Sequence, residues 1–147
     1  MWYKLDLSNY EPRVVPDYKY YNEFGDIDSN TLDWIQNELD NFQDSFGKHW
    51  KSWELSDLKY RLENNWTFYV VEGGWAYIDW NHKNPKLCKK YVVPEYRGTG
   101  LNLDLIWIRC NELVEKGYKE AIMHISDWNK PAQKGLDKKI FTEIVDK

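Results

Sequence analysis

The strongest constraint on the fold lies in residues 91–102, YVVPEYRGTGLN, where a β-branched run ends in a proline and an apolar helical segment follows. Gly98 and Gly100 flank Thr99 between the two. Glycine adopts the left-handed conformations that such a turn needs, so successive N–H groups can point into one concavity. With the positive end of the following helix they would form an anion site, and Arg97 could add a charged contact. Ordinary tight turns use the same residues, and that alternative stays open.

Two common phosphate-binding motifs are excluded by the residues of this turn. The dinucleotide fingerprint G-x-G-x-x-G requires a third glycine at a position that holds Leu103. The P-loop ends in Gly-Lys-Ser or Gly-Lys-Thr, and neither follows these glycines. The sequence therefore supports neither a Rossmann oxidoreductase nor a nucleotidase.

The periodicity of the apolar residues predicts a mixed α/β chain. Spacings of three and four residues are typical of amphipathic helices, and alternation is typical of strands. Two glycines at 73–74 lie between alternating runs and predict a hairpin. Residues 8–28 show no clear period, so they are expected to form a lid, a binding loop or a plain connector. The expected order is a strand at 1–7, helices from Ser29–Thr31 to Gly47 and around Leu55–Leu62, strands at 66–71, 75–80 and 86–93, a helix from Leu101 to Gly117, a strand at 119–126 and a last short helix from Asn129 towards Lys139.

Composition and charge restrict the class of protein. A length of 147 residues fits a single domain over 1–147, and 42% hydrophobic with 30% charged residues is typical of a globular chain. The net charge of −4 argues against a nucleic-acid binder. No apolar stretch reaches the roughly 18 residues of a membrane span, and the N-terminus has no signal-peptide core. An unexported, cytoplasmic protein without a membrane partner is expected.

Cysteine content and acidic residues add two further expectations. Cys88 and Cys110 are too few for a disulfide scaffold or a zinc site, so both are expected in the core and no metal is expected. Residues 1–40 contain nine Asp or Glu against three Lys or Arg. This acidic segment is either a solvated surface or a face that attracts a cationic partner or amine substrate.

Two segments together resemble the GNAT N-acetyltransferases. Residues 92–101, Val-Val-Pro-Glu-Tyr-Arg-Gly-Thr-Gly-Leu, are similar to the acyl-CoA-binding motif of that family. Residues 123–125, followed by Asn129-Lys130-Pro131-Ala132 and Phe141, are similar to a later strand and helix of the same family. The order of the expected elements agrees as well, so the resemblance covers almost the whole chain.

The resemblance implies a fold, a cofactor and a set of binding residues. The fold would be α/β, with a GNAT-type mixed, mostly antiparallel sheet and helices on both faces. Acetyl-CoA would be the acyl donor, with its pantetheine arm between the strands at 86–93 and 119–126 and its pyrophosphate on the N–H groups of the glycine turn. An amine would attack the thioester directly. The implied cofactor-binding residues are Val92, Val93, Arg97, Gly98, Thr99, Gly100, Leu101, Asn102 and Asn129.

The sequence also departs from the family's pattern. Asn102 stands where the motif ends in glycine or alanine, and Asp104 places a negative charge one turn into the helix. The family's tyrosine acid corresponds to Leu136, and six residues follow Phe141 where the family continues through a two-stranded hairpin. No carboxylate lies on the strand at 86–93. The candidates to replace the missing acid and base are His124, Tyr91, Asp79 and His82.

Two functions from different classes follow. The first is an acetyl-CoA-dependent N-acetyltransferase that acts on an unidentified amine, either a small molecule or a protein amine. The second is a catalytically inactive GNAT-like domain that serves as a binding or assembly protein, for example in a bacteriophage virion. A sheet without its final hairpin would leave an open edge beside residues 121–126, so a homo-oligomer or a larger protein assembly is expected.

Overall fold

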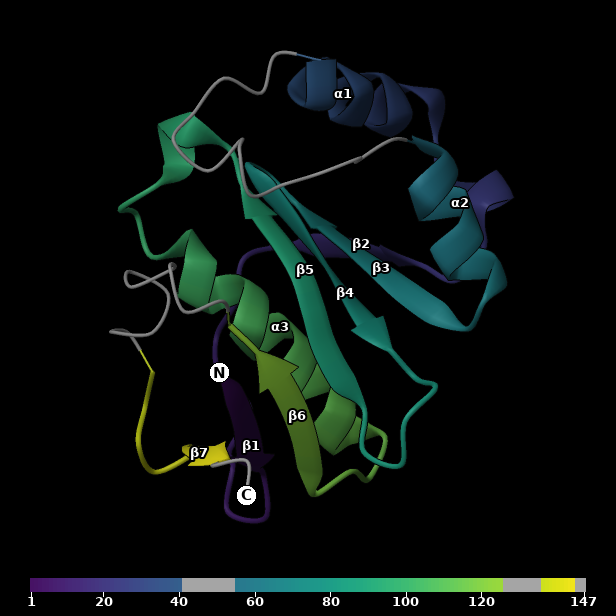
Figure 1. Ribbon diagram of the computed structural model, residues 1–147. Helices are drawn as coiled ribbons and strands as arrows, with labels where there is room; N and C mark the ends of the chain where they lie inside the picture. The colour runs from purple at the N-terminus through teal and green to yellow at the C-terminus, as the bar shows by residue number, and fades with distance from the viewer. Residues whose placement is uncertain (41–54, 126–135, 145–147) are drawn as a thin grey trace.

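The computed structural model describes residues 1–40, 55–125 and 136–144, which form a mixed seven-stranded sheet with helices packed against it (Figure 1). The strands are β1 (Trp2–Asp6), β2 (Tyr18–Tyr21), β3 (Trp66–Val71), β4 (Gly74–Asp79), β5 (Lys86–Val92), β6 (Glu120–His124) and β7 (Phe141–Ile144). The helices are α1 (Ser29–Asp40), α2 (Leu55–Glu63) and α3 (Leu101–Glu115), with short 3-10 turns η1 (Phe24–Asp26) and η3 (Pro94–Tyr96). The strand order is β2-β3-β4-β5-β6-β1-β7.

Helix boundaries follow local capping signals. The Asp28 carboxylate accepts a hydrogen bond of 2.7 Å from the Thr31 N–H, which satisfies a free donor at the start of α1. After α3, Gly117 adopts a φ of +89° and closes the helix in a Schellman motif. The expected start of the first helix and the expected stop at Gly117 are confirmed. The expected end of the first helix, at Gly47, lies outside the described residues.

Alternate residues of the central strands pack into two cores on opposite faces of the sheet. Ala76 and Val92 belong to the core beneath α3, and their neighbours Trp75 and Tyr91 belong to the core beneath α1 and α2. We call these the α3 face and the α1–α2 face (Figure 1). The α/β class, the mostly antiparallel sheet and the helices on both faces are therefore confirmed.

The two halves of the sheet are joined by a very short parallel ladder. β5 and β6 pair in parallel only at Lys86↔Ile122 and Leu87↔Met123, whereas every other strand pairing in the described residues is antiparallel. β6 ends at His124, while β5 runs on to Val92 (Figure 1). Among the described residues, the carboxyl-terminal half of β5 therefore has no strand partner on the side that faces β6.

The N-terminal strand fills the position where an open edge was expected. β1 pairs antiparallel with β6 from Trp2↔His124 to Asp6↔Glu120, and it pairs with β7 on its other side. The expectation of an open edge beside residues 121–126 is therefore wrong, because β1 supplies the hydrogen-bonding partners of β6. The first strand of the chain stands where the family resemblance places its final hairpin.

Two other expectations need correction. Residues 8–28 are not without regular structure, because β2 pairs with β3 from Tyr18↔Val71 to Tyr21↔Phe68. Most of the last expected helix, from Asn129, lies outside the described residues. Its expected end is not helical, since residues 136–140 form a turn that leads into β7. That turn is held by Asp137, whose carbonyl accepts the N–H groups of Ile140 and Phe141.

A fully buried arginine supports the centre of the sheet. A register shift places Ala76 of β4 opposite both Lys89 and Lys90 of β5, and such a bulge locally disrupts the ladder. Arg109 of α3 is 1% exposed and donates to the carbonyls of Tyr77 at 3.0 Å and Cys88 at 3.5 Å. Burial lowers its pKa to about 10, and its hydrogen bonds in the described residues all go to backbone carbonyls.

Replacing Arg109 with methionine tests this support. The Arg109→Met side chain has a similar length but removes the charged donor to two backbone carbonyls, so the free energy of unfolding should fall by about 2–4 kcal/mol. Urea denaturation followed by circular dichroism measures the change. Lys59→Met, which removes an exposed ion pair of 3.9 Å with Glu63, is the control and should change stability by less than about 0.5 kcal/mol. Equal stability of the two variants would contradict the supporting role.

Candidate functional site

The glycine turn between η3 and α3 has the open, left-handed geometry that an anion site needs. Gly98 has a φ of +82° and Gly100 a φ of +91°, and Gly100 is the residue that precedes α3. A Cβ atom built on either glycine would meet nothing within 4 Å, so the space around the turn is open. No side chain caps the start of α3.

Four backbone N–H groups of this turn have no acceptor among the described residues. The Thr99 N–H donates to the Tyr96 carbonyl, and the Leu103 and Asp104 N–H groups donate to Gly100. The four N–H groups that remain belong to Gly98, Gly100, Leu101 and Asn102. Unpaired N–H groups in a glycine turn at a helix start, with the positive end of the helix dipole, favour a bound anion such as a phosphate.

Two charged residues, Arg97 and Asp104, lie near the turn. The Arg97 Nε donates to the Val92 carbonyl at 3.0 Å, and its guanidinium lies 5.8 Å from the centre of the Tyr91 ring. The side chain is therefore folded back over the end of β5. Asp104 lies in the first turn of α3, and burial raises the pKa of its carboxyl.

The backbone of β5 determines which residues can bind a ligand between β5 and β6. The Val93 N–H donates to the Gly73 carbonyl at 2.8 Å, so it faces the β4 side. Because successive backbone groups of a strand point to opposite edges, the N–H and carbonyl of Val92 face the side where β6 has ended. Of the two valines assigned to the pantetheine arm, Val92 is the one whose backbone faces that gap.

The two candidate acid or base residues lie on the same face of the sheet but in different halves. Tyr91 is buried, stacks on Trp75 with ring centres 4.5 Å apart, and places its hydroxyl 3.5 Å from the Glu38 carboxylate. His124 is exposed at the end of β6, and its ring packs edge-on against Trp2 at 4.9 Å. Tyr91 directly precedes Val92 and is therefore the candidate next to the gap.

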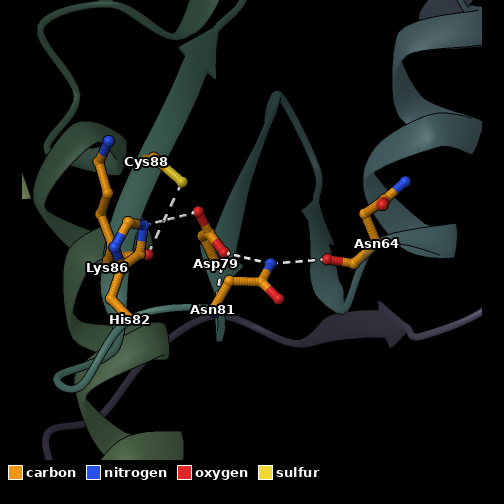
Figure 2. Close-up of polar contacts among 6 residues, drawn as sticks. All are labelled: Asn64, Asp79, Asn81, His82, Lys86 and Cys88. Atoms are coloured by element: carbon orange, nitrogen blue, oxygen red, sulfur yellow. Dashed lines mark hydrogen bonds and ion pairs between the residues drawn. The ribbon is translucent and has the colours of Figure 1, made fainter.

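Asp79 and His82 form a separate cluster at the opposite end of β5. Figure 2 shows the Asp79 carboxylate between His82, at 3.0 Å, and the side chain of Asn81, which also reaches the carbonyl of Asn64. Asp79 pairs with Lys86, so it lies about six residues, or roughly 20 Å at 3.3 Å per residue, from Val92. The cluster stabilises the connection between β4 and β5, and the structure does not bring it to the glycine turn.

The remaining site expectations fall at the carboxyl end of the chain. Leu136 is partly buried and packs against the core of the α3 face, so this position offers no proton donor. Asn129 lies outside the described residues. Among the described residues there is no group of three or more His, Cys, Asp or Glu side chains that could hold a metal ion. None of the helices in the described ranges is long and apolar enough to cross a bilayer.

Lys90 is a charged residue of this region that sequence reasoning missed. It lies in the bulge of β5, next to Lys89, which has a φ of +55°. Burial and the positive charge of Arg109 lower the pKa of Lys90 to about 7. No side-chain partner of Lys90 is found in the described part of the chain. Two adjacent lysines in the middle of this strand were the available signal, because they break the alternation that a regular strand requires.

Comparison with known proteins agrees with this geometry. No family model matches the chain. Over 57 residues it is 35% identical to a thialysine N-epsilon-acetyltransferase from Bos taurus. That match covers 39% of this chain and 34% of the length of the bovine enzyme.

Solved structures match over most of the chain. An aminoglycoside acetyltransferase from an uncultured soil metagenomic sample, in complex with sisomicin, has a TM-score of 0.57 at 14% identity and covers 88% of this chain and 92% of its own. The aminoglycoside N-acetyltransferase AAC(6')-Iy, in complex with CoA, has a TM-score of 0.56 at 16% identity over 89% and 98% of the two chains. A GCN5-related N-acetyltransferase from Sphaerobacter thermophilus has a TM-score of 0.52 at 13% identity over 90% of this chain and 46% of its own.

These similarities establish the fold class. Structures of acetyltransferases superpose on most of this chain with TM-scores of 0.57 and 0.56. The chain has the GNAT fold.

The lowered pKa of Lys90 predicts a pH-dependent effect on stability. An unfolded lysine titrates near 10.5, and the folded residue titrates near 7. Between these two values the unfolded chain binds more protons than the folded chain, so the free energy of unfolding rises with pH. The destabilisation by Lys90 is therefore greatest below about pH 7 and disappears as the pH rises towards 10.5. Lys90→Met should therefore raise the midpoint of thermal unfolding most at pH 6, with a gain that shrinks towards pH 10.

The control for this experiment is Lys83→Met, an exposed lysine in the connection between β4 and β5. Thermal unfolding of both variants and of the unchanged protein is followed across the same buffers. At each pH, the difference in unfolding midpoint between Lys90→Met and the unchanged protein reports the effect of Lys90 alone, because all other titrating groups are common to both. A gain that does not depend on pH would show that Lys90 keeps an ordinary pKa.

Proposed function

We propose that the protein is an acetyl-CoA-dependent N-acetyltransferase that acts on an amine. The observation that carries this proposal is the set of four unpaired N–H groups in the glycine turn, next to the unpaired half of β5. The N–H groups of the turn could bind a pyrophosphate. The exposed backbone edge of β5 could form hydrogen bonds with the extended pantetheine arm. The proposal is supported by the neighbours described as acetyltransferases, one of them in complex with CoA.

The residues of the chain would bind the donor in two parts. The N–H groups of Gly98, Gly100, Leu101 and Asn102 would hold the pyrophosphate, and the Val92 backbone would hold the pantetheine arm. The Val92 carbonyl already accepts from Arg97, which leaves its N–H for the ligand. Asn129 stays part of the proposed cofactor site, on the family resemblance alone.

The transfer itself is a direct acyl exchange. Bound acetyl-CoA supplies the activated acetyl group. The amine nitrogen of the acceptor forms a bond to the thioester carbon, the carbon–sulfur bond breaks, and CoA leaves as a thiolate. The proton lost by the amine passes through solvent or a side chain, and the thiolate gains a proton. We assign Tyr91 to this proton transfer rather than His124, because Tyr91 adjoins Val92 and its hydroxyl lies near the Glu38 carboxylate.

One structural observation still favours the second function, a binding or assembly protein. The assembly alternative, with a homo-oligomer or a larger complex, no longer has an open β6 edge to support it. It still has β7 (Phe141–Ile144) as the outer strand of the described sheet, with Ile144 43% exposed. A strand of another chain could pair there. Light scattering of the purified protein distinguishes an oligomer from a monomer.

Replacing Gly100 tests the cofactor site against a matched control. Gly100 and Gly117 have φ values of +91° and +89°, and an added Cβ would meet nothing within 4 Å at either position. Each alanine variant should therefore lose a similar stability, about 1 kcal/mol. Only Gly100→Ala should disturb the N–H groups at the start of α3. We expect the dissociation constant for CoA to rise at least tenfold in Gly100→Ala and to stay within twofold in Gly117→Ala, by calorimetric titration.

The same variants can be assayed for transfer by release of the free CoA thiol. Gly100→Ala should raise the KM for acetyl-CoA, whereas Gly117→Ala should not. An unchanged protein that binds no CoA at millimolar concentration would refute the proposed function. An equal loss of CoA binding in both variants would mean that the glycine turn is not the binding site.

A further inference from the structure

A second cavity lies on the α1–α2 face, beside the end of β5. Its volume is about 770 Å³, and this open cavity is lined by α1, the turn between β3 and β4, the start of β2 and residues 93–96. This size is within the range of cavities that bind small molecules. None of the residues in the glycine turn lines it, so it is distinct from the place assigned to the pyrophosphate.

The charged groups of this cavity are predominantly acidic. Among the described residues, the carboxylates of Asp17, Glu38, Glu72 and Glu95 line it, against one cationic side chain, Lys19. Lys19 is also paired with the Asp28 carboxylate at 3.9 Å, so its charge is shared with a group outside the cavity lining. The cavity therefore carries a negative potential that would concentrate cations.

Two of these carboxylates, those of Glu38 and Glu95, repel each other electrostatically. Burial raises the pKa of Glu38, and the negative charge of Glu95 raises it further. The Tyr91 hydroxyl and the Arg97 guanidinium favour the charged form of Glu38, but the net shift is still upward. Like charges held close together in a partly buried place are unfavourable unless a cation lies between them.

Aromatic side chains form fixed walls around the carboxylates. Trp34 packs edge-on against Trp75 with ring centres 5.4 Å apart, which holds its ring in place. The Tyr96 ring lies so close to Gly73 that a Cβ built there would be 2.5 Å from it. Tyr96 also shares a hydrogen bond with the Glu72 carboxylate. Aromatic faces attract ammonium groups, and carboxylates between them add a charged partner.

The cavity adjoins the proposed reaction centre. Val93 lines it, and Val93 follows the residue whose backbone faces the gap between β5 and β6. Glu38 lines it as well, and its carboxylate lies 3.5 Å from the Tyr91 hydroxyl. A ligand in the cavity would thus lie on the face of β5 that carries the residue we assign to proton transfer.

We propose that this cavity binds the amine acceptor, and that the acceptor carries at least two ammonium groups. One ammonium would lie between Glu38 and Glu95, and another nearer Asp17 and Glu72. The amine that reacts must lose its proton, so the remaining ammonium groups provide the binding energy. This inference rests on the proposed acetyl transfer, and it narrows the acceptor from amines in general to di- and polyamines.

The first test compares acceptors that share a four-carbon amine unit and differ in the number of ammonium groups. Acetyl transfer to spermidine, 1,4-diaminobutane and butylamine is measured with the unchanged protein by release of the CoA thiol. We expect kcat/KM for spermidine to exceed that for butylamine at least tenfold at low salt. The advantage should decrease as salt is raised, because salt screens the carboxylates. Equal values for spermidine and butylamine would overturn the inference and leave the acetyl transfer intact.

The second test removes single charges from the cavity. Glu38→Gln and Glu95→Gln should each raise the KM for spermidine at least fivefold. Glu11→Gln removes an exposed carboxylate outside the cavity lining, and it should leave this KM within twofold. A KM that rises equally in all three variants would show only a general effect of net charge and would contradict a specific site.

A binding measurement separates this inference from the proposed function. Spermidine is titrated calorimetrically into the protein without any acyl donor. Binding that weakens at least fivefold in Glu38→Gln, but not in Glu11→Gln, supports the cavity even if no amine is acetylated. No binding of spermidine at millimolar concentration overturns the inference even if CoA binds and butylamine is acetylated.

Discussion

The two-residue parallel ladder between β5 and β6 determines the geometry of the candidate site. Because pairing stops after Leu87↔Met123, the rest of β5 presents its backbone to a gap, and Val92 is the residue that faces it. The bulge at Lys89 and Lys90 lies in this same half of β5. Arg109 donates to the carbonyls of Tyr77 and Cys88 next to this bulge, which supplies buried acceptors with a donor.

The N-terminal strand has an equally direct effect on the fold. β6 pairs with β5 over two residues, so most of its hydrogen bonds come from β1 on its other side. Alternation in residues 1–7 predicted a strand, but nothing local to it indicates a partner near residue 124. Pairing over that distance depends on which edges the rest of the sheet leaves unpaired. The expectation of an open edge was wrong because it considered only the residues after Phe141 as partners of β6, whereas the partner is the N-terminal strand β1.

The candidate site was predictable where local chemistry determines it. Glycines at 98 and 100 can adopt positive φ without strain, and both do. The direction of the Arg97 side chain was not predictable, since it depends on the position of the Val92 carbonyl. β2 was missed because Tyr18–Tyr21 has two exposed residues at its centre and no alternation. The acidic cavity brings together residues as far apart as Asp17 and Tyr96, although the excess of acidic residues in 1–40 indicated its charge.

We propose that the N–H groups at the start of α3 bind the phosphates of CoA. This can be tested by titrating ¹⁵N-labelled protein with CoA and following the amide resonances by NMR. We expect the resonances of Gly98 and Gly100 to shift as CoA is added, together with those of Leu101 and Asn102. Those of Gly25 and Gly117, which lie away from this turn, should stay in place. Glycine resonances that do not move at millimolar CoA, or that move most at Gly25 or Gly117, would contradict it.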